Sequence, residues 1–192
     1  MARTQAADYE QRREAIVEEA AKLFAARGFI GASVADLAVA CRTSKSLIYH
    51  YYPSKEDILY AVMASHIDQL VHDVVAVSNE GGDAKAQLRG IVHRFMRHYV
   101  GAASRQKVLL NELDNLPAIK RTEIVASQRD IIDTVTRLLC EISPDLASDP
   151  ARARVQTMLL FGMINWTHTW YDPAGPVAPD TIAEMALSLI LR

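Results

Sequence analysis

The residues best suited to a chemical task lie between positions 42 and 55. This segment contains three Lys or Arg residues, one His, three Tyr and no Asp or Glu. Such side chains donate hydrogen bonds to phosphate oxygens and to base edges. A short helix rich in donors and free of acids therefore suits the major groove of a DNA duplex. The alternative is a solvated polar helix whose tyrosines pack against a neighbouring helix.

Two short helices joined by a polar turn are predicted to position these donors. Ser33 precedes a set of apolar residues at helical spacing, and Asp36 completes a capping box with it, which predicts a helix over residues 34–41. A Thr-Ser pair then precedes a second helix over residues 45–51, and Pro53 ends it. In helix–turn–helix geometry the second helix enters the groove.

The segments GFIGASVADLA and SKSLIYHYYPSKEDIL resemble the DNA-binding domain of the TetR family of transcriptional repressors, over about residues 9–63. The resemblance implies an N-terminal helix–turn–helix domain of three helices that binds a double-stranded DNA operator. The family usually has a Gly-Val pair in the turn and a Gly after the lysine. This chain has Arg42-Thr43 and Ser46 there, and these differences bear on the operator sequence.

The donor pattern and the family resemblance together predict the DNA contacts. Side chains on the exposed face of the second helix are expected to meet base edges or adjacent phosphates, and their neighbours are expected to hold the DNA backbone. Ile48 and Tyr52 are expected to pack inward. The predicted DNA-binding residues are Ser33, Thr43, Ser44, Lys45, Ser46, Tyr49, His50, Tyr51 and Lys55.

Composition limits the remaining possibilities. The 192 residues carry 21 Lys or Arg and 23 Asp or Glu, and residues 1–60 carry eight of each kind, so any DNA contact must come from a local patch. The two cysteines, Cys41 and Cys140, are too few for a disulfide framework, and free thiols in a reducing cytoplasm are expected. No signal peptide is visible, and no apolar run is long enough to span a membrane.

The rest of the chain also predicts helices, which makes the expected fold all-α with about nine helices. Residues 1–8 are expected to form a loose arm, from which Arg3 at most could reach DNA. A DNA-binding domain is predicted over residues 1–54 and a ligand-binding and dimerisation domain over residues 55–192. The predicted helices cover residues 9–27, 34–41, 45–51, 55–79, 84–102, 105–115, 117–142, 150–171 and 179–191.

The helix predicted over residues 150–171 contains the run MLLFGMI, which is apolar on every side. A helix that is apolar all round must be buried all round, and in a small domain a partner chain can cover one face. Gly162 would let a neighbouring backbone approach closely. TetR-like repressors are similar here, because their last two helices form a four-helix bundle between subunits. The resemblance implies a homodimer with two recognition helices on a pseudo-palindromic operator.

Aromatic and thioether residues in the C-terminal half predict a small-ligand site, with basic residues near its mouth. The segments HRFMRHYVGAASRQKVLLNELDNLP and LLFGMINWTHTWYDPAGP look like the acyl-CoA-responsive branch of TetR-like repressors, closest to the phenylacetic-acid degradation repressors. This resemblance implies phenylacetyl-CoA as the inducer, with arginines at the CoA phosphates. Fatty-acyl-CoA is the alternative. The predicted ligand-binding residues are Arg94, Phe95, Arg97, His98, Tyr99, Arg105, Lys107, Phe161, Met163, Trp166 and Trp170.

Other classes of function have less support. An enzyme of CoA metabolism is a distant alternative, because the chain contains no nucleophile elbow, no P-loop and no HExxH motif. A metal or redox sensor is disfavoured because His93 and His98, five residues apart, do not share a helical face. An adaptor that has lost DNA binding would not need the basic residues of the second helix. We therefore expect no catalytic residues, no metal and no cofactor.

Overall fold

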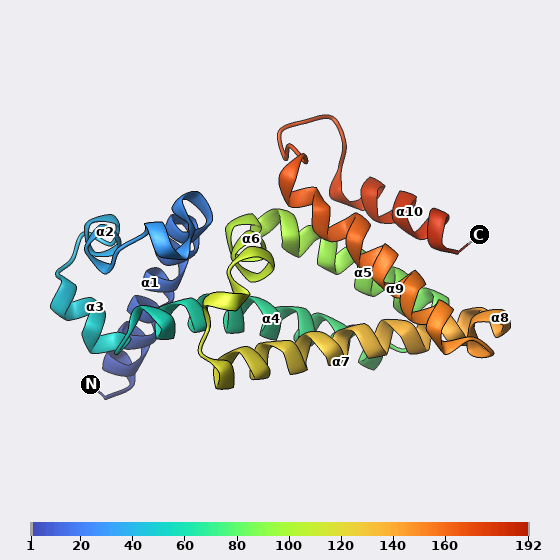
Figure 1. Cartoon of the computed structure of the whole chain (residues 1–192), viewed down its shortest axis with the longest axis horizontal. Helices are drawn as coiled ribbons and strands as arrows, with labels where there is room; N and C mark the ends of the chain where they lie inside the picture. The colour runs from blue at the N-terminus through green and yellow to red at the C-terminus, as the bar shows by residue number, and fades with distance from the viewer. Residues whose placement is uncertain (1, 192) are drawn as a thin grey trace. The chain divides into compact units, whose positions relative to one another are not determined.

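The computed structural model describes the backbone of residues 2–191 and the side chains of residues 8–191, and this part of the chain is helical without strands (Figure 1). Two short 3-10 segments, η1 (Leu113–Asn115) and η2 (Trp166–Thr169), join the α-helices. The α-helices are α1 (Ala2–Gly31), α2 (Val34–Ala40), α3 (Lys45–Tyr51), α4 (Lys55–Glu80), α5 (Ala84–Gly101), α6 (Ala103–Asn111), α7 (Ala118–Ile142), α8 (Pro144–Ala147), α9 (Pro150–Asn165) and α10 (Pro179–Ile190).

Most predicted helices are confirmed, but several boundaries differ, and one short helix was not predicted. Helix α1 begins at Ala2, so the expected loose arm is wrong for its backbone, while the side chain of Arg3 lies outside the described residues. Residues 144–147 form α8, which was not expected because a four-residue helix is too short to show a period. The helix expected to reach residue 171 ends at Asn165 and continues as the 3-10 turn η2.

The chain divides into two compact units. Unit 1 comprises Met1–His66 and Ser104–Ile124, and unit 2 comprises Ile67–Ala103 and Val125–Arg192. Helices α4 and α7 therefore each contribute to both units. The proposed functional boundary between residues 54 and 55 falls inside unit 1, and it remains a prediction.

Unit 1 holds α1, α2, α3 and α6 around one apolar core. Gly28 interrupts α1 with a φ of 72°, a conformation that glycine adopts easily, and one further turn follows it. This break brings the Phe29 ring to 5.5 Å from the Phe24 ring, and both side chains are buried. Leu37 of α2 and Ile48 of α3 are also buried, so all three N-terminal helices share this core.

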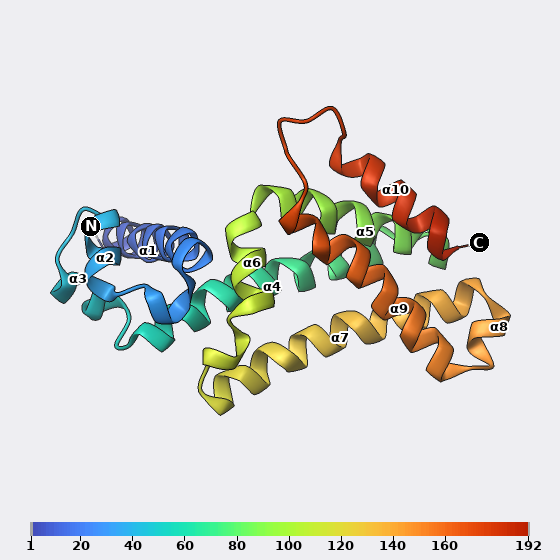
Figure 2. The same cartoon turned by 45° about the horizontal axis from the view of Figure 1, so that its top comes forward.

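In unit 2, α10 packs mainly on α5 and also on α9, as both views show (Figure 2). The buried residues Ala183, Ala186, Leu187 and Ile190 recur at helical spacing along α10 and form its inner face. From α5 the core receives Leu88, Val92 and Phe95, among others. The position of α10 therefore depends on a helix that lies almost ninety residues earlier in the chain.

Candidate DNA-binding surface and ligand domain

Capping hydrogen bonds define both helices of the helix–turn–helix. The Ser33 hydroxyl accepts a hydrogen bond from the Asp36 amide at 3.1 Å, and the Asp36 carboxylate accepts one from the Ser33 amide at 3.0 Å. This reciprocal pair is the capping box predicted from the sequence. The Ser44 hydroxyl accepts from the Leu47 amide at 3.2 Å and so starts α3. Two predicted DNA-contacting serines are thus also helix caps.

The turn between α2 and α3 is a Schellman motif centred on Arg42. The Thr43 amide donates to the Ala38 carbonyl at 2.9 Å, and the Arg42 amide donates to the Val39 carbonyl at 3.0 Å. The motif requires a left-handed residue, and Arg42 has a φ of 52°. The family resemblance places a glycine at this position. This chain keeps the same turn with an arginine, which adds a cation beside the recognition helix.

Helix α3 separates its side chains as predicted for a recognition helix. Ile48 and Tyr52 are buried, which confirms the expectation that they pack inward. Their predicted DNA-binding neighbours Lys45, Ser46, Tyr49 and His50 are exposed. Thr43 and Tyr51 are half-buried, and with Cys41 they border a small cavity of about 120 Å³. The exposed face of α3 therefore carries one ammonium, one hydroxyl, one phenol and one imidazole, with no carboxylate.

Lys55, the last predicted DNA contact, is half-buried at the start of α4. Its ammonium lies 4.1 Å from the centre of the Phe29 ring, within the range of a cation–π interaction. The Phe29 ring is itself buried in the core of unit 1. This contact holds the lysine stem against the DNA-binding helices, so its charge stays near them.

Polar contacts also tie α6 and the start of α7 into unit 1. The Arg105 guanidinium pairs with Glu14 and, at 3.0 Å, with Glu18, both on α1. His66 of α4 is fully buried and Gln106 of α6 is nearly so. A 2.6 Å hydrogen bond joins their side chains. Arg105 was predicted to meet ligand, whereas in this structure its partners are the acids of α1.

Lys120 of α7 pairs with Asp57, the residue that caps the start of α4 together with Ser54. The hydrogen bond from Lys120 and then that from Ser54 lower the pKa of the Asp57 carboxyl. The segment directly after the recognition helix is thus fixed by a residue more than sixty positions away.

In unit 2 a ladder of alternating charges joins α5 to α10. Arg97 donates two hydrogen bonds to Asp180, at 2.9 and 2.8 Å, and His93 lies between Asp180 and Glu184. Arg89 extends the ladder to Glu184 at 2.8 Å. Arg94 pairs separately with Glu80. Two arginines predicted to meet CoA phosphates therefore already have carboxylate partners within unit 2. Spacings of four residues in the sequence place the basic residues on one face of α5 and the acidic residues on one face of α10, but they do not show that the two faces meet.

The ladder predicts that the stability of unit 2 depends on pH. Hydrogen bonds from Arg97, and then from His93, lower the pKa of the Asp180 carboxyl from 3.8 to about 2. Its stabilising contribution should be complete above pH 3.8 and should disappear as the pH falls toward 2. We therefore expect Asp180→Asn to lower the thermal unfolding midpoint at neutral pH, with a deficit that shrinks in acid. Differential scanning calorimetry of both proteins would measure this. A deficit that does not change with pH would contradict the assignment, and Arg97→Gln should reduce the same pH dependence.

The predicted ligand-binding residues do not all lie together in one site. The Phe95 ring lies 5.9 Å from the Tyr99 ring and 6.4 Å from the Phe161 ring, and all three side chains are buried. Trp166 and Trp170, by contrast, are 63% and 57% exposed. Met163 and His98 are half-buried. In unit 1, Lys107 is exposed and borders a cavity of about 230 Å³. Phe95, Tyr99 and Phe161 therefore form the apolar centre of the predicted ligand residues.

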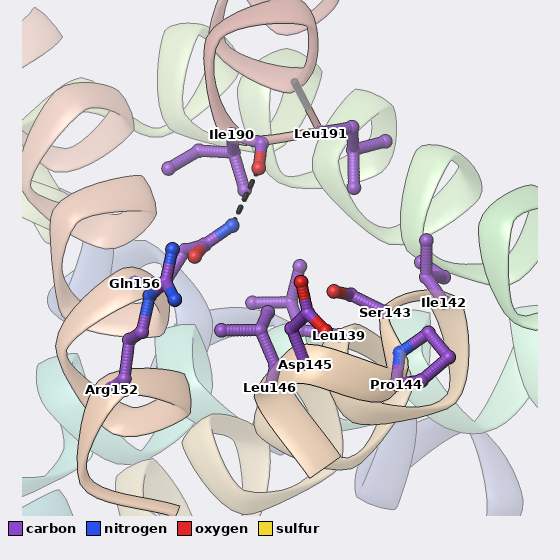
Figure 3. A pocket seen from close by; sticks show the side chains of 10 residues that line it. All are labelled: Leu139, Ile142, Ser143, Pro144, Asp145, Leu146, Arg152, Gln156, Ile190 and Leu191. Carbon is purple, nitrogen blue, oxygen red and sulfur yellow. Dashed lines mark hydrogen bonds between the residues drawn. The ribbon is translucent and has the colours of Figure 1, made fainter. Parts of the chain in front are cut away.

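A separate cavity of about 280 Å³ lies in unit 2, among the ends of α7 and α10, the short helix α8 and the start of α9 (Figure 3). Gln156 donates a 2.5 Å hydrogen bond to the Ile190 carbonyl at its edge. Leu139 and Leu146 contribute apolar surface, and Asp145 and Arg152 bring opposite charges. None of the predicted ligand residues lines this cavity.

An apolar strip remains exposed along α9, η2 and α10. On α9 the inner residues Leu160, Phe161 and Ile164 are buried, whereas Leu159, directly before them, is 59% exposed. A Cβ atom built at Gly162 would meet no atom within 4 Å, so this glycine also faces open space. The exposed strip consists of Val155, Met158, Leu159, Gly162, Trp166, Trp170, Met185 and Leu189.

Burial raises the pKa of the Cys41 thiol, which disfavours the reactive thiolate. Among the side chains of residues 8–191, no group of three or more His, Cys, Asp or Glu is arranged to hold a metal ion. None of the described helices is both long enough and apolar enough to cross a bilayer.

Comparison with known proteins identifies the family. The model for bacterial regulatory proteins of the tetR family matches residues 16–62. The model for the tetracyclin repressor-like C-terminal domain matches residues 81–192, more than half of the chain. These matches cover both the helix–turn–helix and the helices that follow it, and they confirm the predicted TetR-like fold.

Individual proteins similar to this chain support the same family assignment. A TetR-family transcriptional regulator from Bordetella parapertussis 12822 is 40% identical, with 93% of each chain covered and a TM-score of 0.89. The structure of AibR in complex with isovaleryl coenzyme A and operator DNA shows 26% identity, coverage of 93% of this chain and 97% of that chain, and a TM-score of 0.81. The transcriptional repressor KstR2 from Rhodococcus jostii (strain RHA1) is 26% identical over 186 residues, which are 94% of this chain and 89% of that protein. This chain belongs to the TetR family of bacterial transcription regulators, which are DNA-binding proteins and not enzymes.

Proposed function

We propose that this protein is a repressor that binds a pseudo-palindromic operator as a homodimer and is released from it by a small acyl-CoA. The observation that carries the DNA-binding part is the exposed face of α3, which presents Lys45, Ser46, Tyr49 and His50 without any carboxylate. Donors of this kind read base edges and hold phosphates. Ser33, Thr43, Ser44, Tyr51 and Lys55 supply the neighbouring contacts to the DNA backbone.

The apolar strip on α9 and α10 supports the homodimer. Exposed aliphatic and aromatic side chains gathered on two helices that pack together are costly in water and are typical of a surface that a partner covers. The strip includes Met158, Leu159 and Gly162, the exposed residues of the run MLLFGMI. A run that is apolar on every side is expected to be buried on every side, so a partner should cover these residues. A two-fold axis through it would present two recognition helices to two half-sites, one duplex turn or a multiple of it apart.

The proposal of an acyl-CoA inducer is supported by the buried rings of Phe95, Tyr99 and Phe161, which provide an apolar centre for an acyl or aryl group. AibR, with 26% identity over nearly all of this chain, was solved with an acyl-CoA and operator DNA. We propose phenylacetyl-CoA as the first candidate and fatty-acyl-CoA as the alternative. Arg94, Arg97, Arg105 and Lys107 are the proposed phosphate contacts, and the first three would have to exchange a carboxylate partner for the ligand.

The DNA-binding surface can be tested by combining salt dependence with substitution. Lys55→Ala should weaken binding to every duplex and reduce the salt slope of log K by about one unit, because one phosphate contact no longer releases a counterion. Tyr49→Ala should instead reduce the preference for the operator over a scrambled duplex and leave the salt slope unchanged. Fluorescence anisotropy with the promoter fragment upstream of the protein's own gene, at several salt concentrations, measures both quantities.

Matched controls separate these effects from damage to the fold. Lys85→Ala removes an exposed lysine at the start of α5 and should leave both the affinity and the salt slope unchanged. Because Lys55 also lies over Phe29, Lys55→Gln and the unfolding midpoint of each variant are needed to account for lost packing. Equal operator affinity for wild type, Lys55→Ala and Tyr49→Ala at every salt concentration would refute the proposed surface.

A further inference from the structure

The part of α1 between residues 9 and 16 lies against the C-terminal end of the recognition helix. Ile16 is buried, and the Tyr52 hydroxyl donates a hydrogen bond of 3.4 Å to the Arg13 carbonyl. The Arg13 guanidinium lies 5.4 Å from the centre of the Tyr52 ring. Residues 9, 13 and 16 share one face of a helix, which places Tyr9 next in this row of contacts.

Tyr9 closes a triangle of rings with two residues of α3 that are proposed to contact DNA. Its ring centre lies 4.8 Å from that of Tyr51 and 6.5 Å from that of His50, and the Tyr9 and His50 rings meet edge to face. The His50 and Tyr51 rings are 5.3 Å apart, also edge to face. All three distances lie in the range of favourable aromatic pairs, and two of the pairs also have the favoured edge-to-face angle, whereas the Tyr9 and Tyr51 rings are tilted by 39°.

The triangle constrains a side chain that would otherwise rotate freely. His50 is exposed on the proposed DNA-binding face, and an exposed side chain loses rotational freedom when it is fixed against a base or a phosphate. A ring that already packs on Tyr9 and Tyr51 has lost part of that freedom before DNA arrives. Tyr9 itself is 38% exposed, so its removal takes little from the core of unit 1.

We infer that Tyr9 is a positioning residue for operator recognition, which holds the His50 and Tyr51 side chains in the orientation that reads DNA. The inference rests on the proposed DNA-binding function and extends the recognition surface to a residue of α1, outside the helix–turn–helix. Tyr9 acts through its ring, by contact with His50 and Tyr51, and its hydroxyl is not required.

The test compares operator and scrambled duplexes for Tyr9→Ala, Tyr9→Leu, Tyr9→Phe and the exposed α1 control Gln11→Ala. Tyr9→Ala should weaken operator binding by roughly two- to tenfold, the size expected for lost aromatic pairs. Binding to the scrambled duplex and the salt slope should not change. Tyr9→Leu keeps apolar bulk without the ring, and it should show the same loss of discrimination. Tyr9→Phe and Gln11→Ala should match wild type.

A double-mutant cycle identifies the partner. If Tyr9 acts through His50, adding Tyr9→Ala to His50→Ala should cost less than Tyr9→Ala costs alone. Additive losses, equal losses on both duplexes, or a Tyr9→Phe variant as weak as Tyr9→Ala would overturn the inference. Unchanged discrimination in Tyr9→Ala would overturn this inference alone. A wild-type protein that binds both duplexes equally would overturn the proposed function and this inference with it.

Discussion

Gly162→Arg is expected to produce a monomer that folds normally but no longer binds the operator. A Cβ atom at position 162 would meet no atom within 4 Å in the single chain, and the position is exposed, so we expect the folded protomer to accommodate the arginine. In the proposed dimer the same arginine would enter an apolar interface. A buried charge without a partner costs about 3–5 kcal/mol, which corresponds to at least a hundredfold weaker association. Because a single protomer reaches only one half-site, the loss of the dimer should also weaken operator binding.

Light scattering and sedimentation velocity at micromolar concentration would give the mass of each variant, and anisotropy would give operator affinity. Gly101→Arg is the matched control, because Gly101 also faces open space on a helix but lies outside α9 and α10. Its mass and operator affinity should equal those of wild type. A wild type that is monomeric under these conditions would refute the proposed dimer, as would a Gly162→Arg variant that remains dimeric.

The second large effect is expected from the inducer. Phenylacetyl-CoA should release the protein from its operator, whereas free phenylacetate, which lacks the CoA phosphates, should bind far more weakly. Charge-assisted hydrogen bonds from guanidinium groups to phosphates are strong, and the free acid cannot form them. To release DNA, the thioester must bind more tightly to a conformation whose recognition helices do not match the half-sites. Helix α4 is the proposed lever, because it begins directly after the recognition helix and continues into unit 2.

Operator release should be followed by anisotropy during titration with phenylacetyl-CoA, a long fatty-acyl-CoA, free phenylacetate and CoA alone. Quenching of tryptophan fluorescence gives a second signal. The high exposure of Trp166 and Trp170 makes that signal sensitive to dimerisation as well, so it should be repeated with Gly162→Arg. Release by free phenylacetate at the same concentration as by its thioester would contradict the phosphate contacts proposed for the basic residues. Release by the fatty-acyl-CoA alone would favour the alternative ligand.

A substitution of Arg97 bears on the same question. Arg97 already donates two hydrogen bonds to Asp180, so an incoming phosphate would have to replace that carboxylate. Asp180 and the phosphate would compete for Arg97, and this competition sets the direction in which each substitution changes thioester affinity. Asp180→Asn should leave Arg97 more available and strengthen thioester binding, whereas Arg97→Gln should weaken it if Arg97 contacts phosphate.

Local chemistry made the helix–turn–helix predictable from the sequence. The capping box at Ser33 and Asp36 and the cap at Ser44 act over three residues, and the stop at Pro53 acts at one position. Interactions over so few residues can be predicted from the local sequence alone. The inward packing of Ile48 and Tyr52 followed from helical spacing, which depends only on the period of the helix.

Only the tertiary structure decided which distant groups meet. The sequence showed basic residues around α5 but not that Arg97 and Arg105 already pair with Asp180 and with glutamates of α1, because those partners lie more than eighty residues away. Their closeness in the sequence grouped Trp166 with Phe161 as candidate ligand residues, yet Trp166 is exposed and Phe161 is buried, because residues five apart on a helix do not share a face. The sequence by itself determined most of the helices, the caps of α2 and α3 and the inward packing of Ile48 and Tyr52. Side-chain pairing across helices, which depends on how they pack, determined where the remaining charges and rings lie.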